Sequence, residues 1–362
     1  MTEYVTLPLQ GIRVLDLTRL LPGPAAAMHL ADMGAEVLKI EDPGLGDYAR
    51  SMGPVRNDVS LFFAAVNRGK QFLRLDLKQL DQRERFLAMV EQADVVMESF
   101  RPGVMNKLGL GWDALKARNP ALVLCSISGY GQSGPLAQMA GHDINYAGYA
   151  GMLEQNAVAG AMPALPNLQI GDLLGGTQSA LQGILAALVG AKLNGQGRHV
   201  DVAMTDCVFA HNIMPLVAVN HRGRPAEPGL DLLTGGVPCY SLYATSDGRY
   251  MAVGALEHKF WESCCEVLER PDLIERHWSR GQEIGGADAL AVKSELATLF
   301  ASRDLAWWTG KFAHADCCVT PVLRMDEALM HPHFQARHLA CKINHPSEGE
   351  MWQTSPSIKF LG

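Results

Sequence analysis

The sequence predicts an α/β protein, with a doubly wound parallel sheet in a large domain and a smaller α+β domain after it. Strand-like and helix-like segments alternate from residue 12 to residue 204, which is the rhythm of βαβ units. A length of 362 residues exceeds what one hydrophobic core usually holds. After residue 229 the pattern changes to hairpin strands followed by charged helices. These observations together predict two domains of different architecture.

The first βαβ unit covers residues 12–40. Residues 12–17 and 35–40 are short, apolar segments with β-branched side chains, and residues 25–33 between them have helical composition. Gly34 follows this helix, as is typical of helix C-termini. A crossover of this kind is right-handed and makes the two strands parallel. The turn at residues 20–24 lacks a GxGxxG pattern, so the sequence does not favour NAD or FAD binding.

The alternation continues along the chain. Strands are predicted at residues 72–77, 94–97, 122–128 and 198–204, and helices at residues 79–91, 108–118, 175–193 and 205–222. The polar stretch 223–229 indicates a linker. Beyond it, residues 238–244 and 250–255 flank Ser246-Asp247-Gly248, which is a hairpin signal, and helices follow to about residue 309.

Composition narrows the function classes. The net charge of -7 argues against general affinity for nucleic acid, whose phosphates require a basic surface. Residues 1–4 are polar, unlike a secretory signal, and the apolar run at 181–188 is too short to span a bilayer. The eight cysteines form no CxxC motif, which favours reduced thiols. We therefore expect a cytoplasmic protein with no nucleic-acid or membrane partner.

Three side chains that can transfer protons follow predicted turns: His142, Asp172 and Glu257. Each also has a purely structural interpretation. His142 can lie exposed at a helix start that Asp143 or Asn145 caps, and Asp172 and Glu257 can themselves be capping residues. The glycines after Asp172 allow another interpretation, in which backbone N–H groups at the helix start stabilise negative charge on a ligand. The residues alone leave both interpretations open.

Several motifs resemble those of the family III CoA-transferases, the CaiB/BaiF family. They are GPAAAMHLADMGAEVLKIE, ESFRPGVMNKLGLG, SGYGQSGP, AGHDINY, GDLLGG and ATSDGRYMAVGALE, in the family's order between about residues 9 and 322. The resemblance is greatest to the racemase branch. It implies a Rossmann-like CoA-binding domain from residues 1–203 and 327–362, a linker helix and loop at 204–229, and an inserted small domain at 230–326. It also implies that two subunits interlock as a homodimer.

The same resemblance assigns roles to the site residues. In the racemase branch, the residues matching His142 and Asp172 move protons on and off the α carbon of a 2-methylacyl-CoA through an enolate. Glu257 would orient His142, and backbone N–H groups after Asp172 would stabilise the enolate. The CoA part of the substrate would contact Leu75, Lys78, Phe100, Arg101, Lys107, Gly141, Asp143 and Tyr146. No metal is implied, and no cofactor beyond the CoA of the substrate.

The transferase branch implies an alternative use of the same aspartate. There the carboxylate of Asp172 would attack the thioester and carry CoA as an aspartyl thioester, before CoA passes to a second carboxylic acid. His142, Glu257 and the short Gly235-Gly236 loop favour the racemase. The long connection at residues 46–70 resembles that of the transferases. The family often has an arginine shortly after the second strand, where this sequence has Glu41-Asp42-Pro43, so a CoA contact expected there is missing. The acyl chain and any acceptor acid are left open.

Overall fold

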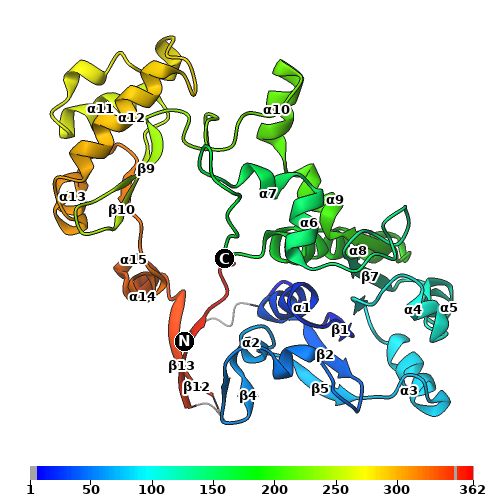
Figure 1. Ribbon diagram of the computed structural model, residues 1–362. Helices are drawn as coiled ribbons and strands as arrows, with labels where there is room; N and C mark the ends of the chain where they lie inside the picture. Colours follow the sequence, from blue (N-terminus) through cyan, green and yellow to red (C-terminus); the bar gives the residue numbers. More distant parts are fainter. Residues whose placement is uncertain (1–5, 346–348, 362) are drawn as a thin grey trace. The chain divides into compact units, whose positions relative to one another are not determined.

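The computed structural model describes residues 6–345 and 349–361, and its largest feature is a six-stranded parallel sheet (Figure 1). The strand order is β5-β2-β1-β6-β7-β8, with parallel pairing throughout. This sheet confirms the predicted α/β fold class. Its strands are β1 (Arg13–Asp16), β2 (Glu36–Glu41), β5 (Gln71–Arg74), β6 (Val95–Glu98), β7 (Val123–Ser128) and β8 (His199–Ala203).

Helices cover both faces of the sheet, because alternate side chains of a strand point to opposite sides. Val14 and Val95 pack in one core with the helices α1 and α8. Leu15 and Val96 pack in a second core with α3 and α5. These helices are α1 (Pro22–Asp32), α3 (Leu80–Val90), α5 (Trp112–Arg118) and α8 (Ser179–Asn194).

The strand order reverses at β1 and β6. β1 pairs with β2 on one side and with β6 on the other. Beyond the strand ends, Leu17 N–H bonds the carbonyl of Met97 at 2.8 Å and Arg19 N–H bonds Ser99 Oγ at 3.0 Å. Doubly wound sheets bind ligands in the crevice beyond the carboxyl ends of strands at this reversal. The loops after β1 and β6 are therefore where the fold favours a ligand.

Three predicted helices differ from those observed. The helix predicted at 108–118 begins later, as α5, and a short helix that was not predicted, α4 (Val104–Lys107), precedes the glycine-containing turn 108–111. The helix predicted at 205–222 is also two, α9 (Met204–Ala210) and α10 (Ile213–Arg222). The helix predicted at 175–193 begins earlier, as the π-helix η2 (Gly171–Gln178), which runs directly into α8. In each case the apolar periodicity indicates a helical segment but does not give where the helix begins or breaks.

Two small hairpins were not predicted. One pairs β3 (Val55–Arg56) with β4 (Val59–Ser60), and the other pairs β12 (Ala340–His345) with β13 (Gly349–Thr354). The guanidinium of Arg56 donates to the carbonyl of Glu350 at 3.4 Å, which joins the first hairpin to the second. The other short helices are α2 (Leu61–Ala65), α6 (Asp143–Tyr149), α7 (Met152–Gln155), α14 (Met325–Met330) and α15 (Pro332–Ala336).

The chain divides into two compact units. The first unit contains the described residues of Met1–Met152, Pro166–Asn212 and Pro332–Gly362. The second unit contains Leu153–Leu165 and Ile213–His331. Compared with the predicted small domain at 230–326, the second unit also takes in residues 153–165, 213–229 and 327–331.

The second unit is built on a three-stranded antiparallel sheet of order β11-β10-β9. The pairing of β9 (Tyr240–Ala244) with β10 (Tyr250–Gly254) confirms the predicted hairpin. Its core is aromatic: Trp261 and Phe300 are fully buried, and Trp308 is nearly so. The remaining elements are α11 (His258–Val267), α12 (Ala287–Phe300), α13 (Leu305–Phe312) and β11 (Val319–Pro321).

One helix in the described part of the chain is long and apolar enough to cross a membrane, the continuous segment Gly171–Asn194. It belongs to the core of the first unit, where Ala180 and Ile184 are fully buried against the sheet. Its apolar character is explained by this packing.

Candidate active site

His142 lies at the start of α6. It is the N-cap residue of that helix and its side chain is exposed. Its backbone N–H donates to Asn145 Oδ1 at 3.0 Å, so Asn145 performs the capping that the sequence allowed for Asp143 or Asn145. Because the ring of His142 is exposed, it is accessible to a ligand.

Asp172 lies in the first turn of η2, with a half-buried side chain. It is not the N-cap residue, since Ile170 precedes the helix. The backbone N–H of Asp172 donates to Asp143 Oδ1 at 3.0 Å. This bond joins the residue after His142 directly to the second predicted catalytic residue, so the structure brings the two segments together.

The environment of Asp172 favours its protonated form. Burial, and then the negative charge of Asp143, raises the pKa of Asp172 to about 7. A carboxyl group with a pKa near neutral pH can both accept and donate a proton under ordinary conditions. This shift is typical of functional carboxylates, although buried structural groups can share it.

Tyr146 holds the loop that carries His142. It is 7% exposed, and its hydroxyl donates to the carbonyl of Gly141. Its ring packs edge-on against Tyr130 with 5.3 Å between centroids. A Cβ on Gly141 would lie 2.7 Å from Tyr146 Cε1, and one on Gly129 only 2.4 Å away. Gly141 and Tyr146, predicted as CoA contacts, therefore pack against each other and fix the loop.

The glycines after Asp172 serve packing, which corrects the expectation that they open the helix start to a ligand. A Cβ on Gly175 would lie 2.6 Å from the carbonyl oxygen of Met204, and one on Gly176 would lie 2.5 Å from Pro22 Cβ. The N–H of Asp172 is bonded to Asp143, and the N–H of Leu173 donates to the carbonyl of Gln169 at 2.7 Å. Neither of these two N–H groups is therefore free to donate to an enolate oxygen.

Glu257 lies in the second unit, whereas His142 and Asp172 lie in the first. It is the N-cap residue of α11, its side chain is exposed, and it makes no capping hydrogen bond. Its charge raises the pKa of the Cys318 thiol, after the larger effect of burial. The structure thus leaves the Glu257 carboxylate accessible, and its contact with His142 stays a prediction.

Five of the predicted CoA residues follow the carboxyl ends of β5 and β6: Leu75, Lys78, Phe100, Arg101 and Lys107. Lys78, Arg101 and Lys107 are exposed and have no ion-pair partner among the residues that the structure describes. Gln138 Nε2 donates to the carbonyl of Pro102 at 3.2 Å. This hydrogen bond connects the loop after β6 to the loop before His142. Leu75 differs from these, since its side chain is 2% exposed and packs in the core.

Arg19 is a candidate that the sequence analysis missed. Its guanidinium lies 5.4 Å from the ring centre of Phe100 and 5.2 Å from that of Tyr48, and it donates to Asp42 Oδ2 at 2.9 Å. It follows the end of β1, where the fold favours ligand binding. Glu41, at the position where the family often has an arginine, instead forms two bonds of 2.8 Å to Arg50. Arg19 therefore supplies a cation at this edge.

A polar cluster near Arg101, in which Glu98 and Ser126 are buried and His199 is exposed, was also missed. Glu98 is 3% exposed, and burial raises the pKa of its carboxyl to about 7. Ser126 Oγ lies 2.9 Å from His199 Nε2. These three side chains and Arg101 line a cavity of about 460 Å³. No single motif predicts the cluster, because its members come from the ends of β6 and β7 and the start of β8.

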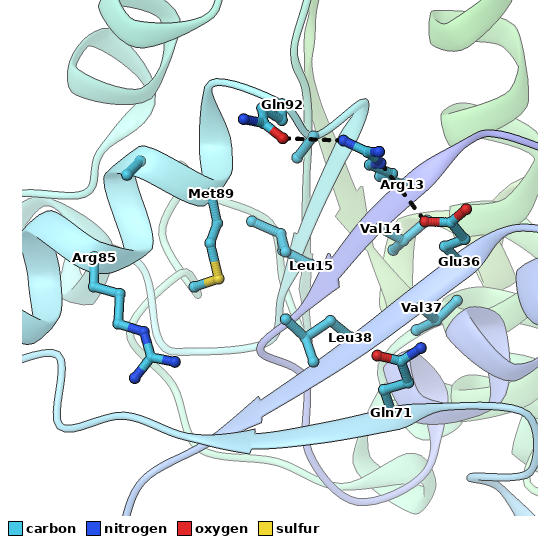
Figure 2. A pocket seen from close by; sticks show the side chains of 12 residues that line it. Arg13, Val14, Leu15, Glu36, Val37, Leu38, Gln71, Arg85, Met89 and Gln92 are labelled. Carbon is cyan, nitrogen blue, oxygen red and sulfur yellow. Dashed lines mark hydrogen bonds and ion pairs between the residues drawn. The ribbon is translucent and has the colours of Figure 1, made fainter.

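A second cavity in the first unit, of about 410 Å³, lies at the opposite end of the sheet. It is lined by the start of β1, β2 and β5 and by α3 (Figure 2). The side chain of Arg13 forms part of its lining: the guanidinium donates to Gln92 Oε1 at 3.1 Å, and its Nε lies 3.6 Å from Glu36 Oε2 (Figure 2). Ligands of parallel α/β sheets bind at the carboxyl ends of strands, so this cavity is not favoured as the substrate site. Within residues 6–345 and 349–361, no three His, Cys, Asp or Glu side chains are arranged to hold a metal ion.

The chain is similar to known proteins in both sequence and fold. The family model described as CoA-transferase family III matches residues 9–361. Human alpha-methylacyl-CoA racemase is 36% identical over 330 residues, which cover 91% of this chain and 81% of the relative. An acetyl-CoA:oxalate CoA-transferase from Acetobacter aceti is 34% identical over 367 residues, covering 98% and 90%. A crystal structure of a CaiB/BaiF family protein from Brucella suis superposes with a TM-score of 0.83 at 26% identity, covering 98% of this chain and 93% of that one.

Proposed function

Because the chain belongs to CoA-transferase family III, and is therefore an acyl-CoA enzyme, we propose that it inverts the α carbon of a 2-methylacyl-CoA. Asp172 and His142 are the two proton-transfer groups of this proposal. The observation that carries it is the 3.0 Å bond from the N–H of Asp172 to Asp143. That bond holds the backbone of Asp172, whose carboxyl group has a pKa raised to about 7, beside the segment that bears an exposed histidine.

Inversion requires one group on each face of the α carbon. In one direction neutral His142 removes the Cα proton, and protonated Asp172 returns a proton to the other face. In the reverse direction ionised Asp172 removes the proton and the imidazolium of His142 returns one. In both directions the enolate lies between an imidazolium and a neutral carboxyl group. The positive charge of the imidazolium stabilises the enolate, and the raised pKa of Asp172 makes the neutral carboxyl accessible.

The remaining predicted residues, together with Arg19, complete the proposal. Glu257 would orient His142 and hold the tautomer that leaves one ring nitrogen free. Lys78, Arg101, Lys107 and Arg19 would neutralise the phosphates of CoA. The reaction breaks and re-forms one C–H bond, so it requires neither a redox cofactor nor a metal. A homodimer and a cytoplasmic location belong to the same proposal.

CoA transfer is the second candidate, and two observations favour it. A CoA-transferase matches 98% of the chain at 34% identity. The long connection at residues 46–70 also resembles the transferases, and it is held to β2, since buried Asp47 pairs with buried Lys39 at 3.0 Å and Arg50 pairs with Glu41. In this candidate the carboxylate of Asp172 attacks the thioester carbon and CoA leaves as its thiolate, which gives a mixed anhydride of Asp172 and the acyl group. The thiolate then attacks the Asp172 carbonyl carbon of the anhydride and releases the donor acid, so that an aspartyl thioester remains to pass CoA to the second acid.

A pair of incubations separates the candidates. The enzyme is given one enantiomer of a 2-methylacyl-CoA, with and without succinate, and both configuration and thioester identity are followed by chiral chromatography. The racemase proposal predicts loss of enantiomeric purity at the same rate in both incubations. Appearance of succinyl-CoA with unchanged configuration of the 2-methyl acid would instead establish transfer. Asp172→Ala and His142→Ala should each abolish inversion, whereas transfer would survive in His142→Ala.

A further inference from the structure

The backbone on both sides of Glu257 is fixed by hydrogen bonds within the second unit. β10 ends at Gly254, and the N–H of Leu256 donates to the carbonyl of Gly254 at 2.8 Å, which closes a three-residue turn. On the other side, the carbonyl of Glu257 accepts from the N–H groups of Phe260 and Trp261 at 3.0 and 3.1 Å, at the start of α11. Glu257 therefore lies at a hydrogen-bonded junction between a strand and a helix.

An indole group holds the peptide group that precedes Glu257. Trp278 Nε1 donates to the carbonyl of Leu256 at 2.8 Å. This carbonyl belongs to the planar peptide group that joins Leu256 to Glu257, so the bond fixes the orientation of the backbone from which Glu257 starts. The donor and the acceptor are 22 positions apart in the sequence. The bond is therefore a tertiary contact and not part of the turn itself.

His277 supports the same turn from inside the protein. It is fully buried, its ring centre lies 5.6 Å from that of Trp278, and its Nδ1 lies 2.8 Å from Ser279 Oγ. Burial lowers the pKa of His277, while the carbonyl groups of Leu256 and Ala255 act in the opposite direction. The imidazole of His277 thus faces the same stretch of backbone that the indole of Trp278 binds.

The carboxylate of Glu257 is exposed on this fixed backbone. Its two basic neighbours in the sequence are engaged elsewhere: His258 Nε2 lies 3.9 Å from Glu275 Oε1, and Lys259 Nζ lies 4.5 Å from the ring centre of Phe260. Within residues 6–345 and 349–361, Glu257 has no ion-pair partner, and its side chain makes no capping hydrogen bond. An exposed, unpaired carboxylate on an ordered backbone is arranged to meet a cation from outside its own turn.

We propose that Trp278 and His277 are positioning residues for Glu257. The inference rests on the proposed function, in which Glu257 orients His142. Trp278 fixes the peptide group before Glu257, and His277 holds Trp278 and the turn together from the buried side. Because this backbone is already ordered, the site loses less conformational entropy when Glu257 meets the imidazole.

Amide hydrogen exchange followed by mass spectrometry tests the positioning and does not depend on turnover. Trp278→Phe removes the indole N–H but keeps an aromatic ring, so amide exchange in residues 255–261 should become several-fold faster. Trp307→Phe is the matched control, because Trp307 lies in α13 of the same unit and is 43% exposed. It should leave exchange in this segment unchanged. Unchanged exchange in folded Trp278→Phe overturns the proposal.

A second variant covers the case in which Trp278→Phe does not fold. Ser279 is exposed, and Ser279→Ala removes only the partner of His277 Nδ1. Exchange in residues 255–261 should again become faster, by less than in Trp278→Phe. The same exchange as in wild type would contradict the role of His277.

A double-mutant cycle shows whether the positioning serves the reaction, with α-proton exchange of a 2-methylacyl-CoA in heavy water as the readout. Trp278→Phe should lower kcat about tenfold and leave KM nearly unchanged, since the predicted CoA residues lie in the first unit. In a Glu257→Gln background the same substitution should have little further effect, because the carboxylate that it positions is gone. Equal losses in both backgrounds would show that Trp278 acts without Glu257, which overturns the proposal.

Failure of the proposed function gives a different result. A wild-type protein that exchanges no α proton, or Glu257→Gln with the rate of wild type, would refute the role of Glu257 in that function. The amide exchange of Trp278→Phe and Ser279→Ala then still decides whether the two residues hold the turn.

Discussion

At the scale of single residues, the bond between Asp143 and Asp172 joins the two segments of the proposed site. It holds the backbone of Asp172, and the charge of Asp143 helps to keep the Asp172 carboxyl group protonated. Resemblance was sufficient to single out both residues from the sequence. Their contact was not predictable, because it joins positions 29 apart that only the packing of α6 on η2 brings together.

Two substitutions of Asp143 separate its hydrogen bond from its charge. Asp143→Asn keeps an oxygen that can accept from the N–H of Asp172 but removes the negative charge, so the pKa of Asp172 should fall below 7. In the direction where Asp172 removes the proton, exchange should then persist to lower pH than in the wild type. Asp143→Ala should lower the rate as well. Rate-against-pH profiles for α-proton exchange check this, and an unshifted profile for Asp143→Asn would contradict it.

The raised pKa of Asp172 also has a consequence for stability. Between its ordinary pKa of 3.8 and about 7, the folded state binds a proton that the unfolded state has released, so stability falls as pH rises through this window. Asp172→Asn has no such proton. The free energy of unfolding of Asp172→Asn, minus that of wild type, should therefore be larger at pH 8 than at pH 4, by on the order of 2 kcal/mol. The variant is then more stable relative to wild type at pH 8.

Urea unfolding of both proteins at the two pH values measures this effect. The same stability difference at pH 4 and pH 8 would show that the pKa of Asp172 is not raised in the folded protein.

At the scale of elements, the π-helix η2 depends on glycines that permit close packing. Gly175 lies against the backbone of Met204 at the start of α9, and Gly176 lies against Pro22 at the start of α1. Ser179 Oγ donates to the carbonyl of Leu174 at 2.9 Å, five positions earlier. The sequence predicted a helix here but not its π geometry, because apolar periodicity does not distinguish a local insertion from a regular α-helix.

Replacing two glycines by alanine tests this packing. In Gly175→Ala the new Cβ would lie 2.6 Å from a backbone oxygen, which cannot move cheaply, so we expect destabilisation of about 1–3 kcal/mol. Gly190→Ala in α8 is the matched control, because nothing lies within 4 Å of its Cβ position. It should stabilise the helix by about 0.5–1 kcal/mol. Thermal unfolding measures both changes, and equal effects would be evidence against the packing role of Gly175.

At the scale of the whole molecule, alternation of strands and helices was sufficient to predict the parallel sheet. The hairpin of β3 and β4 escaped prediction because strands of two residues carry no periodic signal. The break between α9 and α10 was not predicted, because it coincides with a tertiary contact that periodicity does not reveal: the side-chain amide of Asn212 donates to the carbonyl of Ala150. The elements that were found are those whose own residues repeat regularly.

The exposed apolar side of α10 predicts an interface. Ile213, Leu216 and Val217 are 62%, 57% and 53% exposed, which is costly for side chains of this size in water. We expect them to be buried against a second copy of the chain, as the predicted homodimer requires. Leu216→Glu should shift the mass in sedimentation equilibrium from dimer towards monomer, whereas Leu361→Glu, at a site 92% exposed, should not. A monomeric wild type would refute the dimer.

The central claim is that His142 and Asp172 move protons at the α carbon, and deuterium incorporation tests it most directly. One enantiomer of a 2-methylacyl-CoA is incubated with the enzyme in heavy water, without any acceptor acid, and its Cα–H signal is followed by proton NMR. The two-group mechanism predicts that the Cα proton is replaced by deuterium while both configurations appear, and that Asp172→Ala abolishes both changes. Complete retention of the proton and of the starting configuration would contradict it.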